Sequence, residues 1–405
     1  MKIDVFSEIG KLKTVLLHRP GKELENLTPD LLERLLFDDI PYLKVAQEEH
    51  DAFAETLRKQ GVEVLYIKDM VIEALAHHPE VKTHFVNTFL EESLIKSSRV
   101  RTELYQYCMS LKTEDMVEKM IEGIRKHDVN INKSNSIMDM LEDEYPFYTD
   151  PMPNILFQRD PFSSIGNGVV INKMFTDARQ RETILSEYMF LYHPRFENEE
   201  IPQYVDRNYR YNSEGGDMLV LNEETLAIGI SKRTDPRAIE KIARELFQRN
   251  TSFKTILAFN IPKTRAFMHL DTVFTQVDYG VFTIHPGIME KLTIFEITKG
   301  KENELVVSKV VTTLEDILQK HLNRPIKLIH CGGKDIITSG REQWNDGANT
   351  LAVAPGVVVV YSRNHVTNEM LREEGITVLE IPSSELSRGR GGPRCMSMPL
   401  EREKI

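Results

Sequence analysis

One supersecondary unit recurs along this chain and constrains the fold more than any other feature of the sequence. Each copy reads as a β-hairpin, then a helix, then a further strand. The hairpins are indicated by short apolar runs on either side of a glycine-containing or polar turn, at residues 166–168, 222–224, 278–280 and 355–356. Apolar residues at helical spacing follow these turns, and strand-like runs at 255–259, 326–329 and 376–381 close three of the units.

The N-terminal residues supply only part of such a unit. They contain strand-like runs at 14–17 and 62–67 with a predicted helix between Pro41 and Gly61, but no hairpin. We expect residues 395–400, at the other end of the chain, to supply the missing strand and complete a fifth module. Repeated units of this size favour a closed radial array. A doubly wound parallel sheet is the alternative, because alternating strands and helices also produce it.

Residues 70–145 interrupt this repeat. Strand signals disappear there, and Val117, Met120, Ile121 and Ile124 follow helical spacing. We therefore predict a five-module α/β domain formed by residues 1–69 and 146–405, with an all-helical insert domain at 70–145, after the first module.

Charge and cysteine content exclude several classes of protein. A formal net charge of −11 over 405 residues argues against nucleic acid or an anionic membrane surface as the main partner. No apolar run approaches the roughly 20 residues that span a bilayer, and residues 1–5 lack the apolar core of a signal peptide. Three cysteines without a CxxC pair do not form a disulfide framework. These features predict a reducing, cytoplasmic location.

Each module opens on a polar cluster directly before its hairpin. The clusters are Arg159-Asp160-Pro161-Phe162, Glu214-Gly215-Gly216-Asp217, Met268-His269-Leu270-Asp271, Cys331-Gly332-Gly333 and Arg394-Cys395-Met396. In a radial array, equivalent positions converge on one axis, so the five clusters would form one site. In an extended chain, His269 and Asp271 would share a face. Taken singly, these residues could also be surface or turn residues.

The converging side chains would be one thiol, one imidazole and three carboxylates. A cysteine with a histidine and an orienting carboxylate is an arrangement for covalent catalysis, and the charges of Arg390 and Arg394 would favour the thiolate of Cys395. Further carboxylates would repel the oxyanion formed from an acyl substrate. A planar guanidinium cation, in contrast, matches carboxylates bidentately. The spacings match no zinc pattern, so no metal is expected.

These motifs resemble those of the arginine deiminases, in the guanidine-modifying (pentein) superfamily, whose fold is a five-bladed α/β propeller of ββαβ modules. The resemblance covers essentially the whole chain and includes the helical insert. It rests on Met152-Pro153-Asn154 and residues 157–162, 179–183, 214–217, 268–272 and 395–399, in that order. It implies hydrolysis of L-arginine to L-citrulline and ammonia in arginine catabolism, without a metal or organic cofactor. It also implies a homodimer or a larger homo-oligomer.

The resemblance further assigns a role to each site residue. Cys395 would attack the guanidinium carbon. His269 would protonate the departing ammonia and then activate water against the amidino-thioether intermediate, while Glu214 orients the imidazole. Asp160 and Asp271 would hold the guanidinium nitrogens. The remaining substrate contacts would be Asn154, Phe157, Arg179, Arg233 and Arg390. The arginines would face the substrate carboxylate, and Arg390 would lie on a lid-like loop. The effect of Arg394 stays open.

Two other functions remain as alternatives. An agmatine deiminase or an amidinotransferase would use the same groups on a different guanidine. A non-catalytic arginine-binding protein would use the modules as a scaffold, but it has no need of a thiol and an imidazole placed together.

Overall fold

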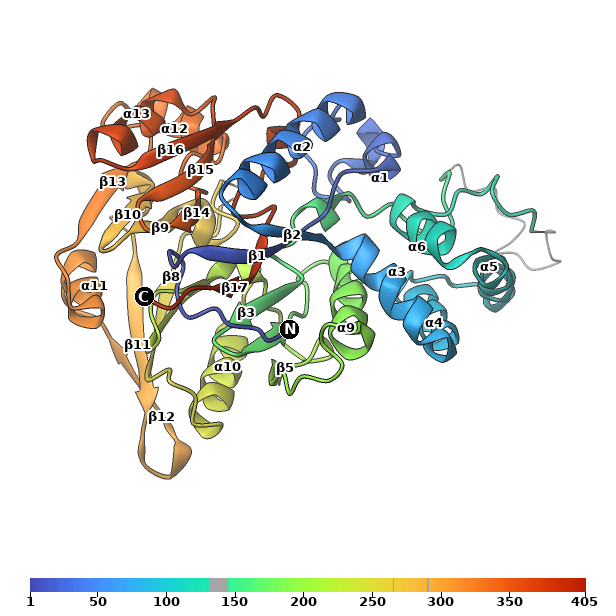
Figure 1. The fold of residues 1–405 in the computed structure, drawn as a ribbon, viewed down its shortest axis with the longest axis horizontal. Helices are drawn as coiled ribbons and strands as arrows, with labels where there is room; N and C mark the ends of the chain where they lie inside the picture. Colours follow the sequence, from blue (N-terminus) through green and yellow to red (C-terminus); the bar gives the residue numbers. More distant parts are fainter. Residues whose placement is uncertain (132–144, 265, 290) are drawn as a thin grey trace.

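Among the described residues, five separate β-sheets carry the fold, and each contains an antiparallel pair of strands with a further strand parallel to one of them (Figure 1). The computed structural model describes residues 1–131, 145–264, 266–289 and 291–405. In one sheet, β3 (Phe162–Ile165) is antiparallel to β4 (Gly168–Ile171), which is parallel to β5 (Gln203–Val205). Helices α8 (Asp177–Gln180) and α9 (Glu182–Tyr192) connect β4 to β5.

The same order of elements is repeated three more times along the chain. The repeats are β6 (Met218–Val220), β7 (Thr225–Ile230), α10 (Pro236–Gln248) and β8 (Thr255–Asn260); β9 (Phe274–Asp278), β10 (Val281–Ile284), α11 (Leu314–Leu322) and β13 (Lys327–His330); and β14 (Leu351–Ala354), β15 (Val357–Tyr361), α13 (His365–Glu373) and β16 (Thr377–Ile381). All four hairpin turns lie where the sequence predicts them. Because the strands are divided among five sheets, the alternative of one doubly wound sheet is wrong.

The two ends of the chain form the fifth sheet together. Strand β17 (Met398–Arg402) is antiparallel to β1 (Leu12–Leu17), and β1 is parallel to β2 (Glu63–Tyr66). Helices α1 (Lys22–Glu25) and α2 (Leu43–Lys59) lie between β1 and β2. The prediction that a C-terminal strand completes the N-terminal module is confirmed. However, β17 begins at Met398, so Cys395 lies in the turn before the strand.

Several elements were not foreseen from the sequence, among them the short strand β5 that follows α9. Strands β11 (Thr293–Lys299) and β12 (Leu305–Lys309) form a hairpin that pairs with β8, and this extends one sheet to five strands. The hairpin projects from the rest of the molecule (Figure 1). Helix α12 (Ile336–Trp344) lies between β13 and β14. Strand β12 is largely exposed, so it lacks the apolar run of a buried strand.

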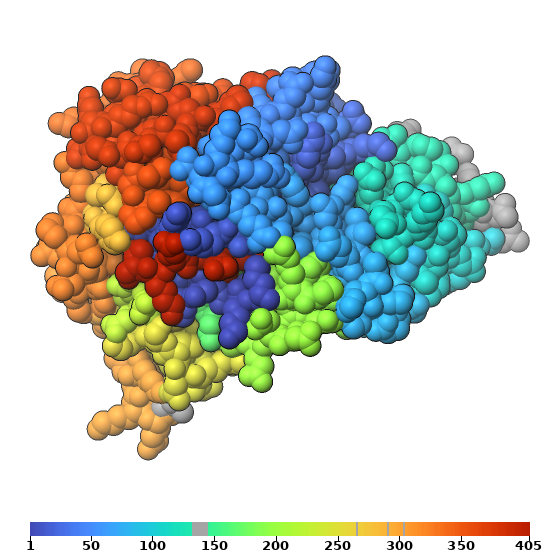
Figure 2. Space-filling view, viewed as in Figure 1, coloured from blue at the N-terminus to red at the C-terminus, as the bar shows by residue number. Residues whose placement is uncertain are grey.

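A group of helices follows β2 directly. These helices are α3 (Ile67–His77), α4 (Lys82–Glu92), α5 (Ser98–Ser110) and α6 (Thr113–Glu122). They form a lobe at one side of the molecule (Figures 1 and 2). The predicted apolar face of α6 is buried, and it shares one core with α3, α9 and the β3–β4 hairpin. Residues 132–144 of the predicted insert lie outside the described residues.

None of the helices that the structure describes is both long and apolar enough to cross a bilayer.

Candidate active site

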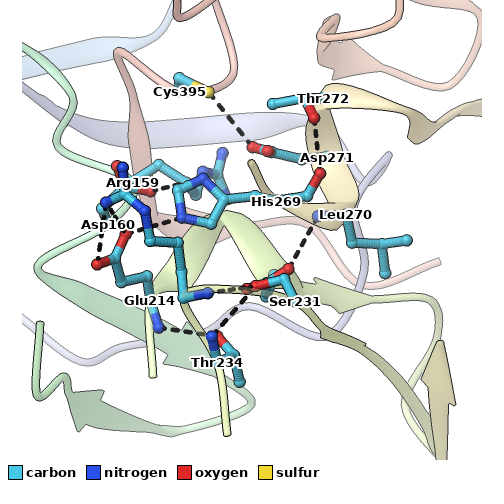
Figure 3. Close-up of polar contacts among 12 residues, drawn as sticks. Arg159, Asp160, Glu214, Ser231, Thr234, His269, Leu270, Asp271, Thr272 and Cys395 are labelled. Atoms are coloured by element: carbon cyan, nitrogen blue, oxygen red, sulfur yellow. Dashed lines mark hydrogen bonds and ion pairs between the residues drawn. The ribbon is translucent and has the colours of Figure 1, made fainter. Parts of the chain in front are cut away.

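The polar turns before the hairpins bring their side chains to one buried cluster (Figure 3). Asp160 lies before β3, Glu214 before β6, and His269 and Asp271 before β9, while Cys395 lies before β17. All five are buried. The turn at Gly215–Asp217 must be glycine-rich, because a Cβ atom on Gly216 would lie 2.7 Å from Nδ1 of His269. The sequence prediction that these five side chains converge agrees with this geometry.

The imidazole of His269 lies between two carboxylates. Its Nε2 is 2.8 Å from Oε2 of Glu214, and its Nδ1 is 3.8 Å from Oδ1 of Asp160. Burial alone would lower the pKa of His269. The charge of Asp160 and the hydrogen bond with Glu214 outweigh that effect and raise the pKa to about 9. The imidazole is therefore protonated at neutral pH, as a general acid requires.

The backbone around this histidine differs from the expected extended chain. Leu270–Thr272 is a turn of 3₁₀ helix, so the alternation that would place His269 and Asp271 on one face is wrong. The turn is held by Asp217, whose Oδ1 accepts a hydrogen bond from the backbone N–H of Leu270 (2.9 Å). The hydroxyl of Ser231 donates to the other oxygen of Asp217 (2.7 Å). This local structure orients Asp271 toward the thiol instead of toward His269.

The thiol of Cys395 lies against a carboxylate that also binds an arginine. Its Sγ is 3.6 Å from Oδ2 of Asp271, and Nη1 of Arg394 is 2.7 Å from the same oxygen. Burial and nearby carboxylates, Asp271 first, raise the pKa of Cys395 well above its usual value. Arg394 by itself lowers the pKa of Cys395, as the sequence predicts, but burial and the carboxylates outweigh this effect, so the group is a thiol in the free protein.

The charge of Arg394 is shared with a second carboxylate, that of Glu8. Its guanidinium makes two hydrogen bonds to Glu8, at 3.0 and 3.1 Å, and a third to the backbone oxygen of Met218 (2.8 Å). Burial by itself would raise the pKa of Glu8, but Arg394 and Arg159 lower it to about 2. Glu8 therefore stays negatively charged at neutral pH and balances the charge of Arg394, the residue before Cys395. The role of Glu8 was not predicted from the sequence, because 386 residues separate Glu8 from Arg394.

The arginines predicted to contact substrate are already bonded to acidic groups. Arg179 donates to Asp160 (2.7 Å) and makes a bidentate contact with Glu182. Arg233 donates to Glu214 at 3.1 Å.

Arg390 lies in the glycine-rich loop, in left-handed backbone conformation (φ 60°). Its Nη1 is 3.2 Å from Oδ2 of Asp38, and its guanidinium carbon lies 3.6 Å from the centre of the Trp344 ring. The three arginines are thus within the site, with their charges balanced by neighbouring side chains.

The module of β14, β15 and β16 contributes a residue that was not identified from the sequence. Oδ1 of Asn349 accepts a hydrogen bond from the backbone N–H of Cys395 (3.0 Å), and its Nδ2 donates to the backbone oxygen of Asp271 (3.0 Å). The predicted contributor, Cys331-Gly332-Gly333, is wrong: Cys331 is buried beside Thr367, outside this cluster. Asn349 could have been identified by its position in the sequence, because it lies just before β14 as the other site residues lie just before their hairpins or strands.

A small cavity of about 20 Å³ opens beside the thiol. Its lining includes every predicted site residue except Glu214 and Asp271, namely Asn154, Phe157, Asp160, Arg179, Arg233, His269, Arg390 and Cys395. Two buried oxygens near it, Oδ1 of Asp160 and Oδ1 of Asp271, accept no hydrogen bond from the residues that the structure describes. Burying a carboxylate oxygen costs free energy unless a hydrogen-bond donor is bound to it. The site is therefore prepared for a cationic donor.

A metal ion was not expected from the sequence, although three donor atoms lie close together here. The donors of Asp160, Glu214 and His269 are all within 4.8 Å of one another. Both carboxylates already bind arginine guanidinium groups, and His269 carries a proton. This cluster is suited to holding N–H donors, and a thiol beside it can attack an electron-poor carbon of a planar cation.

The comparison with known sequences identifies close relatives. The profile of the family "Arginine deiminase" matches residues 33–402. The chain is 57% identical over 407 residues to an arginine deiminase of Clostridium perfringens, covering 100% of this chain and 98% of that one. It is 54% identical over 404 residues to an arginine deiminase of Borrelia duttonii, with coverage of 100% and 98%.

Solved structures with low sequence identity share the α/β fold. An amidinotransferase of the saxitoxin pathway of Microseira wollei superposes with a TM-score of 0.53 at 14% identity, covering 100% of this chain and 98% of that one. A DDAH from Pseudomonas aeruginosa, in complex with citrulline, gives a TM-score of 0.51 at 14% identity, with coverage of 96% and 99%.

Proposed function

The chain belongs to the arginine deiminase family, and from this membership we propose that its site hydrolyses L-arginine to L-citrulline and ammonia. The observation that carries the proposal is a pair of buried carboxylate oxygens, Oδ1 of Asp160 and Oδ1 of Asp271, that accept no hydrogen bond from the described residues and lie near the thiol of Cys395. A guanidinium group offers planar N–H donors and a positive charge to both oxygens at once. Its central carbon would then lie within reach of the sulfur.

The bound cation also accounts for activation of the nucleophile. In the free protein, carboxylates hold the pKa of Cys395 high, so the group is a thiol. A guanidinium bound between Asp160 and Asp271 adds the positive charge that the sulfur lacks, which lowers the pKa of the thiol. The thiol proton passes to solvent water, and the thiolate attacks the guanidinium carbon, forming the carbon–sulfur bond as a carbon–nitrogen double bond becomes single. Nucleophile formation is thereby coupled to substrate binding.

His269 then moves protons in two successive steps. Its imidazolium donates a proton to the leaving nitrogen, ammonia departs, and an amidino-thioether remains on Cys395. The neutral imidazole next removes a proton from water as the water oxygen attacks the same carbon. The carbon–sulfur bond breaks, citrulline is released, and the sulfur regains its proton before the next cycle. Glu214 stabilises the imidazolium through the hydrogen bond to Nε2.

We propose that the substrate carboxylate is bound by arginines that exchange partners. Arg179, Arg233 and Arg390 line the cavity, and in the free protein each is paired with a protein carboxylate. Because the cavity is only about 20 Å³, these side chains must move before arginine can enter. Asn154 and Phe157, which precede β3, would contact the same ligand.

The test is a direct assay of products from several substrates. The wild-type protein should release citrulline and ammonia from L-arginine, and Cys395→Ala should release none while retaining its fold by circular dichroism. Agmatine lacks the carboxylate, so turnover that favours agmatine would contradict the substrate assignment. Citrulline formation only in the presence of an acceptor amine would indicate an amidinotransferase, and arginine binding without product would indicate a binding protein.

We also propose that the five modules are the blades of a five-bladed α/β propeller, with residues 70–145 as a helical insert domain. The support is that one turn from each module reaches the same site, through Asp160, Glu214, His269, Asn349 and Cys395. A homodimer or larger homo-oligomer is expected, and sedimentation equilibrium would test it.

A further inference from the structure

A second group of three metal-binding side chains lies outside the active site. His77 is the last residue of α3, His78 follows it, and Glu197 lies in the segment after α9. Nε2 of His77 is 3.2 Å from Oε1 of Glu197, and Nε2 of His78 is 2.7 Å from Oε2 of the same carboxylate. The donor atoms of all three residues lie within 4.8 Å of one another.

We propose that His77, His78 and Glu197 bind one zinc ion. Two imidazole nitrogens and a carboxylate oxygen form a ligand set that zinc accepts, with a water in the fourth position of a tetrahedron. Ligands about 2 Å from a common ion in that geometry lie about 3 Å apart, and the two nitrogens lie 3.2 and 2.7 Å from the two different oxygens of Glu197. The side chain of His77 is 49% exposed, so the ion can enter from solvent and a water can complete its coordination.

The orientation of His78 supports a ligand role. Its second ring nitrogen, Nδ1, lies 2.9 Å from Oε1 of Glu80. A histidine that binds a metal through one nitrogen usually donates a hydrogen bond through the other, often to a carboxylate, and this contact fixes the ring and its tautomer. Glu80 therefore occupies the position of an outer-sphere partner, and it directs Nε2 of His78 toward Glu197.

The contrast with the active-site cluster shows why this group is available to an ion. In the active site, Arg179 and Arg233 already neutralise Asp160 and Glu214. At Glu197, the ion pairs of the described residues involve only the two imidazoles, and no lysine or arginine among them reaches this carboxylate. Zinc would replace the protons that the imidazoles otherwise need in order to bond to Glu197.

The position of the site suggests what the ion does. Helix α3 begins the helical lobe, and α9 belongs to the β3–β5 sheet; the two helices pack against each other. A zinc ion here would join residues 119 positions apart in the sequence, His78 and Glu197. Because zinc would bind the folded arrangement and not the unfolded chain, it should raise the thermal stability of the protein.

The experiment measures zinc binding in a Cys395→Ser parent, so that zinc does not bind the active-site thiol. Isothermal titration with zinc chloride at neutral pH should give one ion per chain and a rise in Tm. The variant with both His77→Ala and His78→Ala should lose both effects, and Glu80→Gln should bind about 10-fold more weakly. His127→Ala is the matched control, because this histidine is 72% exposed and lies outside the cluster.

Two results would overturn the proposal. One is a parent protein that binds no zinc when the ion is in excess. The other is a double variant that binds zinc with the same stoichiometry and affinity as the parent. Neither readout uses arginine turnover, so the test is independent of the proposed activity.

Discussion

Replacing Glu8 with glutamine tests whether the buried ion pair between Glu8 and Arg394, next to Cys395, stabilises the folded protein. The side chain keeps its shape and one oxygen, but it loses the charge that faces Arg394. The change of the Glu8 pKa from 4.5 to about 2 corresponds to about 3 kcal/mol of folding free energy, at about 1.4 kcal/mol per pKa unit. Since the lowered pKa belongs to a carboxyl group, this stability is present above pH 4.5 and is lost as the pH falls through about 2. At neutral pH we therefore expect Glu8→Gln to lower the free energy of unfolding by about 3 kcal/mol.

Urea denaturation at neutral pH and at acid pH measures this effect. The difference between wild type and variant should shrink as the pH falls below 4.5, because Glu8 then becomes protonated in the unfolded wild type. Glu403→Gln is the control: Glu403 pairs with Lys13 at the surface, where such pairs contribute little. An unfolding free energy unchanged at neutral pH in Glu8→Gln would refute the reasoning.

The same variant makes a second measurement possible at the thiol. With Glu8 neutral, the charge of Arg394 is offset by Asp271 alone, so the pKa of Cys395 should fall. The pH dependence of alkylation by iodoacetamide should then move to lower pH in Glu8→Gln. A shift to higher pH would show that Glu8 does not act on the sulfur through Arg394.

Three further predictions concern the site itself. Asn349→Ala removes the hydrogen bond to the backbone N–H of Cys395 (3.0 Å), and we expect kcat to fall by about 10- to 100-fold with little change in KM; a normal kcat would contradict this role. The pKa of His269 is about 9, so turnover should decline as the pH rises through that value. Because this pKa is raised, its contribution to the free energy of unfolding is complete below pH 6.5 and is lost as the pH rises through about 9. If the free energy of unfolding of His269→Asn fell by the same amount over this pH range, the assignment to His269 would be refuted. Gly391→Ala would place a Cβ atom 2.3 Å from the ring of Phe157, so the loop should be displaced and KM for arginine should rise, as steady-state assays can show.

Local sequence signals were sufficient to predict the modules and the positions of most site residues. The hairpin turns carry glycine or polar residues, and Asp160, Glu214, His269 and Cys395 each precede a hairpin or strand of the observed fold. Convergence of these positions follows from repetition of one unit. Asn349 could have been found by the same rule, because it lies directly before β14.

Other features depend on contacts that no local pattern records. Arg394 is next to the thiol in the sequence, yet its partner Glu8 comes from the opposite end of the chain, and burial and nearby carboxylates outweigh the effect of Arg394 on the pKa of Cys395. The 3₁₀ turn at Leu270–Thr272 is fixed by Asp217, from another module. Similarly, the zinc ligands His78 and Glu197 are brought together only by the packing of α3 on α9.

The central claim is that the sulfur of Cys395 becomes covalently bonded to the substrate carbon during turnover. Acid quenching of the wild-type protein while it turns over L-arginine, followed by intact-mass measurement and peptide mapping, tests this directly. We predict a species heavier by the mass of arginine less ammonia, with the added mass on the peptide that contains Cys395, and no such species in Cys395→Ser. Citrulline production by Cys395→Ser at the wild-type rate, or an adduct located on another residue, would contradict the account.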